Sequence, residues 1–141
     1  MSAASKRLVL RQACAKDLPW LFRYDPHISK SMMQDKVARS EVMVALEAGR
    51  HIGLLRYSLY CDWIPFIIFL FVLEDHRRTG VGSQLATFFE RQMRRSRFKL
   101  AMVSSASAGT SQHFWRKMGY HDAGCLCVPH ESFEILFAKE L

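Results

Sequence analysis

The sequence has no long hydrophobic run, and it is short of cysteine and of acidic residues. Its longest apolar stretch is the eleven-residue segment from Trp63 to Leu73, whereas a membrane-spanning helix needs about 20 residues. Near the start, Lys6, Arg7 and Arg11 surround only a short apolar run, too small for the hydrophobic segment of a secretory signal. These absences predict a cytoplasmic chain with no membrane partner.

Cysteine is scarce, with four residues in 141, too few for a disulfide framework in a chain of this length. Cys14 and Cys61 stand alone in the sequence. Cys125 and Cys127 have a C-x-C spacing, but no second pair lies at a ligand spacing. We therefore expect reduced structural thiols rather than a zinc site, and the sequence implies no metal.

Acidic side chains are outnumbered, because 13 Asp plus Glu stand against 20 Lys plus Arg, a net charge of +7. This excess favours a polyanionic partner: nucleic acid, an acidic surface or a phosphorylated small molecule. One stretch of nine positions has five basic residues and no acid: Arg91, Arg94, Arg95, Arg97 and Lys99. Because exposed aromatic residues do not alternate with them, we interpret the run as the solvated end of a helix, with nucleic-acid contact as the alternative.

The sequence does contain enough apolar material for a folded core, since 50% of its residues are hydrophobic. Its length predicts one domain, residues 1–141, without linker or repeat. Periodicity predicts the element order β-α-α-β-β-β-α-β-α-β-β. The strands are expected at 7–12, 42–46, 52–60, 66–73, 99–104, 120–128 and 133–139, and the helices from 17, at 31–39, from 81 and at 110–118.

The apolar segment 66–73 predicts a fully buried strand that follows a turn at 62–65. A helix connects this strand to the one at 99–104, so the two are expected to be parallel neighbours. The predicted fold class is therefore mixed α/β around a largely antiparallel sheet.

A polar loop follows the apolar strand, with the pattern Arg77-x-x-Gly80-x-Gly82 at the start of an amphipathic helix. Glycine lets the backbone turn sharply and approach a ligand closely. The first amides of a helix have no intrahelical partner, and the helix dipole places partial positive charge there. Arg77 and Arg78 add full charges. We therefore predict a pyrophosphate site rather than an ordinary tight turn.

Two better-known phosphate motifs are excluded. Ser83 and Gln84 follow Gly82, where the loop of nucleoside-triphosphate-binding proteins needs Lys and then Ser or Thr. The dinucleotide fingerprint needs a third glycine, and Leu85 stands at that position.

The segment from Val72 to Gly82, Val-Leu-Glu-Asp-His-Arg-Arg-Thr-Gly-Val-Gly, resembles the acetyl-CoA signature of the GNAT superfamily of N-acetyltransferases. That signature is Val, four residues, Arg or Gln, two residues, Gly, one residue, and Gly or Ala. The segment from Phe114 to Tyr120, Phe-Trp-Arg-Lys-Met-Gly-Tyr, resembles the family's second signature, an aromatic pair followed by x-Lys-Leu-Gly-Phe. The resemblance extends over essentially the whole chain. It implies a GNAT-type α/β (α+β) fold: a mixed, mostly antiparallel sheet of six or seven strands, flanked by helices, with a splayed parallel pair in the middle.

The resemblance also implies acetyl-CoA as a cosubstrate that lies between the splayed strands. Its pantetheine arm would pair with the backbone of Leu70, Phe71 and Val72, and an amide near Phe71 or Val72 would hold the thioester oxygen. Trp115, in the second signature, would belong to the same cofactor site. The pyrophosphate would bind to Arg77, Arg78, Thr79, Gly80, Val81, Gly82 and Ser83.

Two residues depart from the family pattern. Trp115 stands where the resemblance places a tyrosine acid, and an indole N–H cannot give up its proton at working pH. Ala108 stands where Asn is frequent. The general acid and base are therefore left unassigned. The candidates are Tyr120, for which a packing role fits better, His76 and Glu74, with Asp62 or His27 acting through water as further alternatives.

The acceptor pocket implied by the resemblance is built by the first two helices, their loop and the middle strands. Its candidates are Tyr24, His27 and Arg56. An arginine on the buried side of a central strand usually pairs with a carboxylate, so we interpret Arg56 as half of a structural ion pair. The alternative is that Arg56 binds an acidic group of the acceptor.

The predicted function is an acetyl-CoA-dependent N-acetyltransferase. It would acetylate a primary amine of a small molecule or peptide by direct attack in a ternary complex. One alternative, motivated by Trp115 and Ala108, is a CoA-binding module with weak or lost catalysis. The other is a basic nucleic-acid-binding domain. The resemblance leaves a homodimer open.

Overall fold

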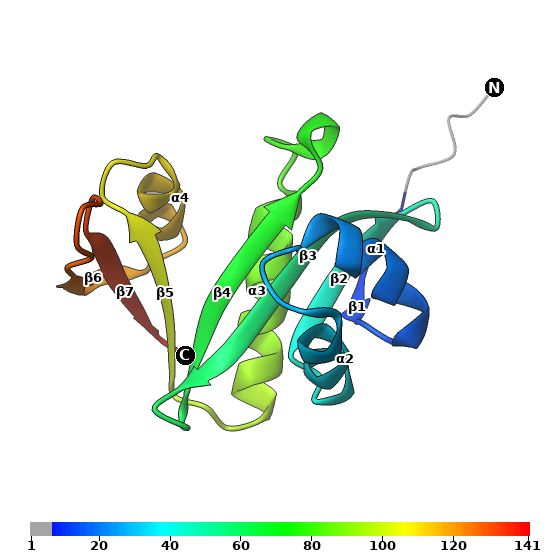
Figure 1. The fold of residues 1–141 in the computed structure, drawn as a ribbon, viewed down its shortest axis with the longest axis horizontal. Helices are drawn as coiled ribbons and strands as arrows, with labels where there is room; N and C mark the ends of the chain where they lie inside the picture. The colour runs from blue at the N-terminus through cyan, green and yellow to red at the C-terminus, as the bar shows by residue number, and fades with distance from the viewer. Residues whose placement is uncertain (1–6) are drawn as a thin grey trace. The chain divides into compact units, whose positions relative to one another are not determined.

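The structure, a computed structural model, describes residues 7–141, so the sequence-based expectations for Lys6 and its predecessors lie outside the described residues. The strands form one sheet with the order β1-β2-β3-β4-β5-β7-β6 (Figure 1). They are β1 (Leu8–Gln12), β2 (Val42–Glu47), β3 (Arg50–Tyr60), β4 (Ile64–Val72), β5 (Leu100–Ala106), β6 (His121–Leu126) and β7 (Glu134–Glu140). The helices are α1 (Leu18–Tyr24), α2 (Lys30–Ala38), α3 (Val81–Arg95) and α4 (Ser111–Lys117), with 3₁₀ turns η1 (Ala15–Asp17) and η2 (Glu74–His76).

This order of elements confirms the predicted fold class. β4 and β5 are parallel, with Phe66 opposite Met102 and Ile67 opposite Val103. The pairs β1–β2, β2–β3, β5–β7 and β6–β7 are antiparallel. The expected splay between the parallel strands β4 and β5 stays a prediction.

The described chain divides into two compact units, and the division falls inside β3, β4 and α3. The first unit consists of residues 7–56 and 69–89, and the second of residues 57–68 and 90–141. We describe each unit by itself. The expectation of a single domain over residues 1–141 stays a prediction.

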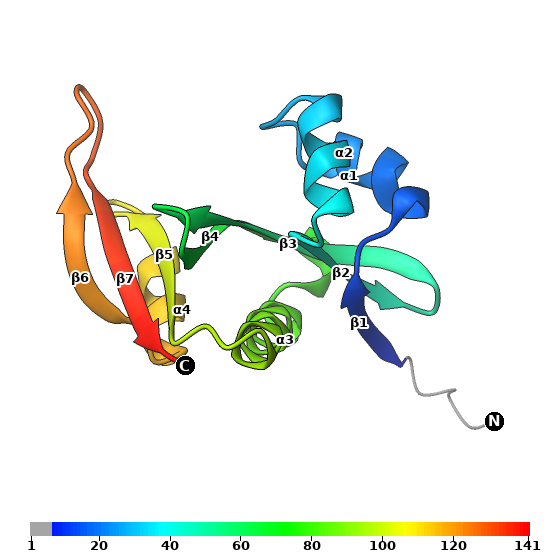
Figure 2. The ribbon, with the colours of Figure 1, turned by 90° about the horizontal axis from the view of Figure 1, so that it is seen from below.

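The core of the first unit lies on both faces of β2. On one face, where α1 and α2 lie (Figure 2), Val42 and Val44 are fully buried against Leu21 and Met33. Met43, which points to the opposite face by strand alternation, is also fully buried. The beginning of α3 lies on that side of the sheet in Figure 2. β2 is therefore an interior strand covered on each face.

α3 has the amphipathic pattern that the sequence predicted. Val81, Leu85, Phe89 and Met93 are all buried, at 6% exposure or less, and Phe88 is half-buried. The basic run that begins near the end of this helix is exposed at every basic position, as expected for a solvated helix end.

Gly53 of β3 accounts for the close packing of three elements in the first unit. A Cβ atom at this position would lie 2.9 Å from the carbonyl oxygen of Phe71 on β4 and 3.1 Å from Leu85 Cδ1 on α3. The amide of Leu73 also donates to the carbonyl of Ile52 at 2.8 Å. The absence of a side chain at residue 53 thus lets the end of β4 and α3 pack directly against β3.

In the second unit, β5 pairs with β7 along its whole length, from Leu100 opposite Glu140 to Ala106 opposite Glu134. Lys139 of β7 donates to both carboxylate oxygens of Glu90, at 2.8 and 3.0 Å, and to the carbonyl of Met118 at 2.7 Å. Glu90 is only 2% exposed, so this lysine neutralises a buried charge and ties the end of α4 to β7. Gly119, predicted as a left-handed cap, has φ 91°.

The prediction for the apolar strand was wrong in two respects. β4 begins at Ile64 and includes Pro65, so the turn is shorter than expected. The strand is also not fully buried, because Ile68 is 48% exposed. Trp63, the residue before the first residue of β4, is 61% exposed. Ile68 lines an open groove instead of packing in the core, and the apolar run therefore overstates the burial.

The expectation of structural thiols is also corrected. Cys14, Cys61, Cys125 and Cys127 are free and exposed, so they do not pack as small core residues. Cys125 lies on β6, an edge strand whose six residues are all exposed. Within residues 7–141, no three metal-binding side chains come together. In the same range, no helix combines the length and the apolar character needed to cross a bilayer.

Candidate functional site

The loop between β4 and α3 presents backbone amides at the start of a long helix. After η2, Arg78 (φ 61°) and Gly80 (φ 88°) take left-handed conformations. Gln84 donates its amide to the carbonyl of Gly80 at 3.0 Å, which is the first bond of the helix. The amides of residues 81–83 precede this bond and therefore have no intrahelical acceptor. The partial positive charge of the helix adds to them, so the geometry suits an anion.

Two exposed arginines lie next to these amides. Arg77 Nε donates to the carbonyl of Val72 at 3.0 Å, and its guanidinium lies 5.8 Å from the centre of the Phe71 ring. The hydroxyl of Thr79 donates to the carbonyl of His76, which closes the loop. No ion pair among residues 7–141 uses Arg77 or Arg78. Both positive charges are thus available to a phosphate.

The end of β4, which carries Leu70, Phe71 and Val72, runs directly into this loop. All three residues are half-buried. The Val72 carbonyl already accepts the bond from Arg77, so Arg77 fixes the end of the strand relative to the loop. The Phe71 ring lies 5.7 Å from the ring of Tyr24 on α1, and so stands between the loop and the acceptor candidates.

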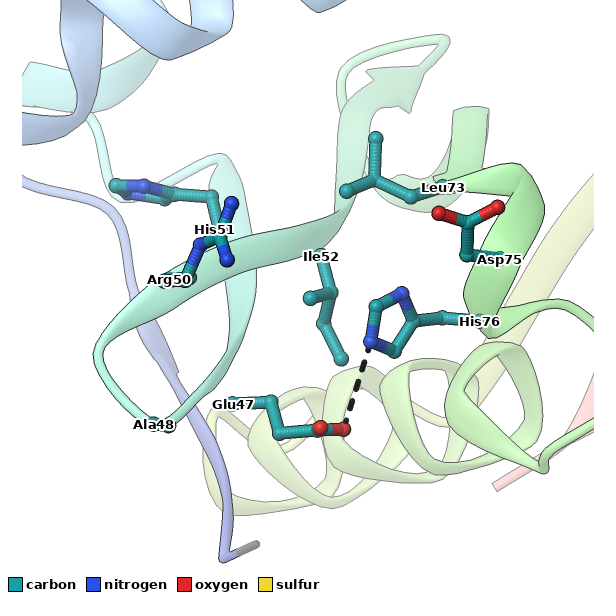
Figure 3. A pocket seen from close by; sticks show the side chains of 8 residues that line it. All are labelled: Glu47, Ala48, Arg50, His51, Ile52, Leu73, Asp75 and His76. Atoms are coloured by element: carbon teal, nitrogen blue, oxygen red, sulfur yellow. Dashed lines mark ion pairs between the residues drawn. The ribbon is translucent and has the colours of Figure 1, made fainter.

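His76 lies in a cavity of about 310 Å³ between the β2–β3 hairpin and η2 (Figure 3). Its Nε2 atom is 3.6 Å from Glu47 Oε2, and its buried Nδ1 atom has no protein partner. Arg50, His51 and Asp75 also line the cavity. Glu74 lies on the same turn as His76 but is exposed and outside this lining. The structure thus gives His76, and not Glu74, a defined carboxylate neighbour.

The acceptor candidates His27 and Arg56 meet at one buried carboxylate. Arg56 Nε donates to Asp25 Oδ2 at 2.6 Å, and His27 Nδ1 lies 3.0 Å from Asp25 Oδ1. Arg56 is 4% exposed and Asp25 is 1% exposed. The ion pair expected for Arg56 is therefore present. The sequence analysis called for a carboxylate partner of Arg56 without naming it, and the structure shows that this partner is Asp25.

Aromatic side chains surround this group within the first unit. The His27 ring lies 4.7 Å from the ring of Phe69, and Tyr24 is stacked on Trp20 at 4.7 Å. Tyr24, His27 and Arg56 thus belong to one cluster, centred on Asp25 and on the aromatic residues of β4.

Tyr120 lies in the second unit and has the environment of a core side chain. It is 1% exposed, and its ring packs edge-on against Trp115 at 5.3 Å. Its hydroxyl has no protein partner. Burial, with a smaller contribution from the negative charge of Glu90, raises the pKa of Tyr120 far above its ordinary value. Tyr120 therefore holds its proton tightly, which favours packing over acid catalysis.

Trp115 is also buried, at 4% exposure, between Tyr120 and Phe114. His113, two residues earlier on α4, is exposed. Little of the indole reaches solvent, so Trp115 shapes this end of the second unit mainly by packing.

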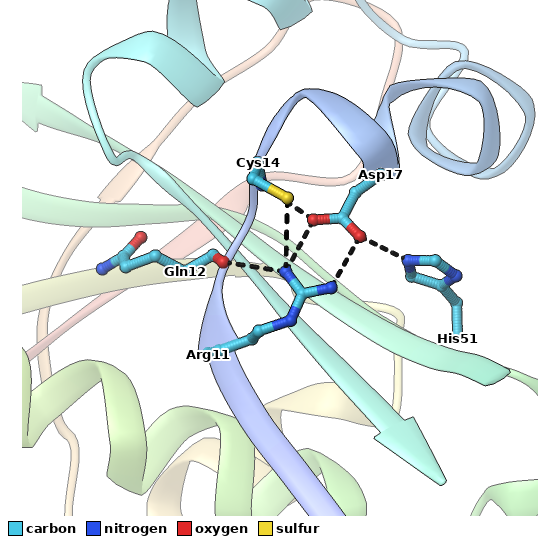
Figure 4. Close-up of polar contacts among 5 residues, drawn as sticks. All are labelled: Arg11, Gln12, Cys14, Asp17 and His51. Carbon is cyan, nitrogen blue, oxygen red and sulfur yellow. Dashed lines mark hydrogen bonds and ion pairs between the residues drawn. The ribbon is translucent and has the colours of Figure 1, made fainter. Parts of the chain in front are cut away.

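A second carboxylate that the sequence did not single out joins three parts of the first unit (Figure 4). Asp17 is 1% exposed and accepts hydrogen bonds from Arg11 at 2.8 and 2.9 Å, and from the Cys14 amide at 2.7 Å. His51 Nε2 lies 2.7 Å from Oδ1 of Asp17, the oxygen to which Arg11 Nη2 also donates. Burial alone would raise the pKa of Asp17, but these bonds outweigh it and hold the pKa well below its usual range. His51 is 34 residues away from Asp17 in the sequence, so no local pattern records this contact.

A family comparison covers both candidate motifs. The sequence model of a family described as "Acetyltransferase (GNAT) domain" matches residues 38–122, more than half of the chain. This range includes β4, the anion loop, α3 and α4. No curated protein matches the sequence.

Solved structures share the fold at low sequence identity. The chain is similar to Ard1 from Thermoplasma volcanium, with a TM-score of 0.82 and 20% identity over 95% of this chain and 97% of that one. It is similar to the ribosomal-protein-S18-alanine N-acetyltransferase from Escherichia coli, with a TM-score of 0.78 and 11% identity over 95% of this chain and 94% of that one. It is also similar to a GNAT family acetyltransferase from Elizabethkingia anophelis with acetyl-CoA bound, with a TM-score of 0.72 and 18% identity over 95% of this chain and 98% of that one. At these identities the likeness establishes the fold.

Proposed function

Because this chain belongs to the acetyltransferase (GNAT) family, we propose that it is an acetyl-CoA-dependent N-acetyltransferase acting on a primary amine of a small molecule or peptide. The observation that carries the proposal is the anion loop. Unpaired amides at residues 81–83 and two exposed arginines lie together where the family signature falls.

The residues of this loop fit a diphosphate in number and in charge. The amides of Val81, Gly82 and Ser83 would donate to its oxygens, and the left-handed conformation of Gly80 directs the chain into the helix. Arg77 and Arg78 would balance its negative charge, and Thr79 closes the loop behind them. This arrangement supports the proposal that residues 77–83 bind the cofactor.

The end of β4 fits the arm that follows the diphosphate. Backbone groups of Leu70, Phe71 and Val72 would pair with an amide-containing chain as a strand does, and an amide near Phe71 or Val72 would donate to the thioester oxygen. Bound acetyl-CoA supplies an activated acetyl group. For the amine to attack it, the amine must first lose a proton, since alkylamines have a pKa of about 10.4.

Neither Trp115 nor Tyr120 of the second signature suits the role of general acid. Trp115 cannot release its proton, and the raised pKa of Tyr120 makes it a poor donor. These two observations favour a second candidate function, an acetyl-CoA-binding module with weak or lost catalysis. His76 and Glu74 remain the candidates for proton transfer, and His76 is the better placed because Glu47 lies beside it.

The acceptor would meet the cluster around Asp25. His27 and Tyr24 provide its reachable groups, since Tyr24 is half-buried and the His27 side chain is 60% exposed. The side chain of Arg56 is 5% exposed and already paired, so its role is to hold Asp25.

A charge inserted at the helix start tests the proposal. Ser83 is the third residue of α3, where a carboxylate suits the helix dipole but would repel a diphosphate. Ser83→Glu should therefore leave the melting temperature unchanged or higher and weaken acetyl-CoA binding at least tenfold by calorimetry. Ser96→Glu, just beyond the other end of α3, makes the same charge change and should bind as the unmodified protein does.

The two candidate functions separate on thiol release. Acetyl-CoA binding followed by CoA release above background with some member of an amine panel supports the transferase. Binding without release across the panel supports the binding module. Equal acetyl-CoA affinity in Ser83→Glu and the unmodified protein would refute the placement of the diphosphate.

A further inference from the structure

One face of the sheet in the second unit carries an open, mainly apolar groove of about 400 Å³. It lies across the end of β3, the beginning of β4, β5 and the β6–β7 hairpin, all of which belong to that unit. The side chains that matter here are Tyr60, Phe66, Ile68, Leu126, Leu136 and Glu134.

The pairing of the strands explains why these side chains share one face. Phe66 and Ile68 are two residues apart on β4 and therefore point to the same side. On the neighbouring strands Leu136 is opposite Ser104, and Leu126 is opposite Glu134. Residues opposite one another in a sheet project to the same face. The groove is thus built by the regular register of the sheet.

The apolar residues of the groove are incompletely covered. Ile68 is 48% exposed, Tyr60 49% and Leu126 56%. Tyr60 and Phe66 hold one wall together, with ring centres 6.0 Å apart. Large apolar side chains gathered in one concave site and open to solvent are typical of a binding site.

Glu134 gives this groove a negative charge. Its Oε1 atom accepts a hydrogen bond from the Ser104 hydroxyl at 3.2 Å, which holds the carboxylate toward the groove. None of the ion pairs within residues 7–141 uses Glu134. The groove therefore combines an apolar wall with a carboxylate that has no cationic partner, in a chain whose net charge is +7.

We propose that the groove binds an amphipathic cation, with the ammonium at Glu134 and an alkyl or aromatic body against Phe66, Ile68 and Leu126. This inference goes beyond the proposed function, because it assigns a ligand to the second unit alone and makes no claim about the acceptor of acetyl transfer. A ligand with a carboxylate, such as a free amino acid, would bring that charge close to Glu134 and bind less well.

Binding without acetyl-CoA tests this proposal independently of catalysis. Three probes share a phenylethyl body and differ in the head group: 2-phenylethylamine is cationic, 2-phenylethanol is neutral and 3-phenylpropionate is anionic. By calorimetry, the amine should bind at least tenfold more tightly than the alcohol, and the carboxylate most weakly. Glu134→Gln should remove the preference of amine over alcohol, while Glu131→Gln, at an exposed position of the same hairpin loop, should keep it.

A second variant tests the apolar wall. Ile68 is half exposed, so the Ile68→Ala variant should fold normally. The substitution should lower the affinities for the amine and for the alcohol by the same several-fold factor. If Glu134→Gln unfolds, the comparison of the three probes on the unmodified protein and on Ile68→Ala still decides the question.

Three outcomes would overturn the proposal: equal affinity for amine and alcohol, an unchanged preference in Glu134→Gln, or a dimer by sedimentation whose dissociation follows Ile68→Ala. The last would assign the groove to a second copy of the chain. Binding of acetyl-CoA is measured in a separate titration. If acetyl-CoA does not bind, the proposed function is refuted. If acetyl-CoA binds but the amine does not, this inference is refuted and the proposed function is unaffected.

Discussion

Asp17 shows how one buried carboxylate can organise several segments at the scale of single residues. It binds Arg11 of β1, the amide of Cys14 and His51 of β3. A carboxylate with this many donors is strongly held in its charged form. Its contribution to stability therefore depends on pH.

The sign of that dependence follows from the lowered pKa of Asp17. An unfolded aspartate has a pKa of about 3.9, so Asp17 stabilises the fold fully above roughly pH 5 and loses this effect as the pH falls below 4. Asp17→Asn should reduce the free energy of unfolding by about 2 kcal/mol at pH 7. The reduction should shrink as the pH approaches 3, as measured by urea unfolding.

The matched control is Asp35→Asn, at an exposed position on α2. It should change stability little at either pH. If Asp17→Asn destabilises the protein equally at pH 7 and pH 3, the carboxylate does not act through its charge.

Sequence reasoning at this scale succeeded where one residue constrains another. A buried arginine requires a carboxylate, and Arg56 has one in Asp25. Tyr120 was expected to have a packing role, and it is buried in the core. Sequence reasoning failed for the contact between Asp17 and His51. This contact exists because β3 runs beside η1 in the fold, and no local sequence pattern records that.

At the scale of elements, Gly53 makes the packing of β3, β4 and α3 sensitive to a single methyl group. Gly53→Ala would place a Cβ atom 2.9 Å from the Phe71 carbonyl oxygen, so the backbone of β4 would have to move. We expect a loss of about 2 kcal/mol in the free energy of unfolding, measured with urea. Acetyl-CoA affinity should also fall, since Phe71 belongs to the proposed binding segment.

Gly109→Ala is the comparison for this substitution. Its nearest neighbour would be 3.4 Å away, an ordinary contact, and we expect stability within about 0.5 kcal/mol of the unmodified protein. An equally mild effect at Gly53 would show that β4 can shift freely at this point.

The elements themselves were predictable to different degrees. α3 was clear because its apolar residues repeat at helical spacing, and all but the half-buried Phe88 are buried. β6 was predicted at 120–128 but spans His121–Leu126, because an edge strand with no buried face gives no alternation to mark its ends. β4 was placed correctly as a parallel neighbour of β5, but its composition could not show that Ile68 faces an open groove.

At the scale of the whole molecule, ligand binding should appear as stability. A ligand that binds only the folded state at 100 times its dissociation constant adds about 2.7 kcal/mol to the free energy of unfolding. We expect this gain from acetyl-CoA, measured by chemical unfolding at a saturating concentration. At the same concentration the gain should be smaller by at least about 1.3 kcal/mol in Ser83→Glu, whose affinity is expected to be at least tenfold weaker.

Oligonucleotides provide the contrasting ligand. Stabilisation by an oligonucleotide that falls steeply with added salt, in the absence of any effect of acetyl-CoA, would instead support the nucleic-acid-binding alternative and the basic run near residue 95. The order of elements was predictable from sequence across the whole chain. The division into two units was not, because it depends on contacts between distant residues.

The backbone passes from one unit to the other after residues 56, 68 and 89. A fragment that begins at residue 90 would contain β5 but lack Phe66 and Ile67, the β4 residues that pair with it. Such a fragment would expose the unsatisfied edge of β5. A gene truncated or split near that point should therefore yield two insoluble pieces, recoverable only if both are present when the chain folds.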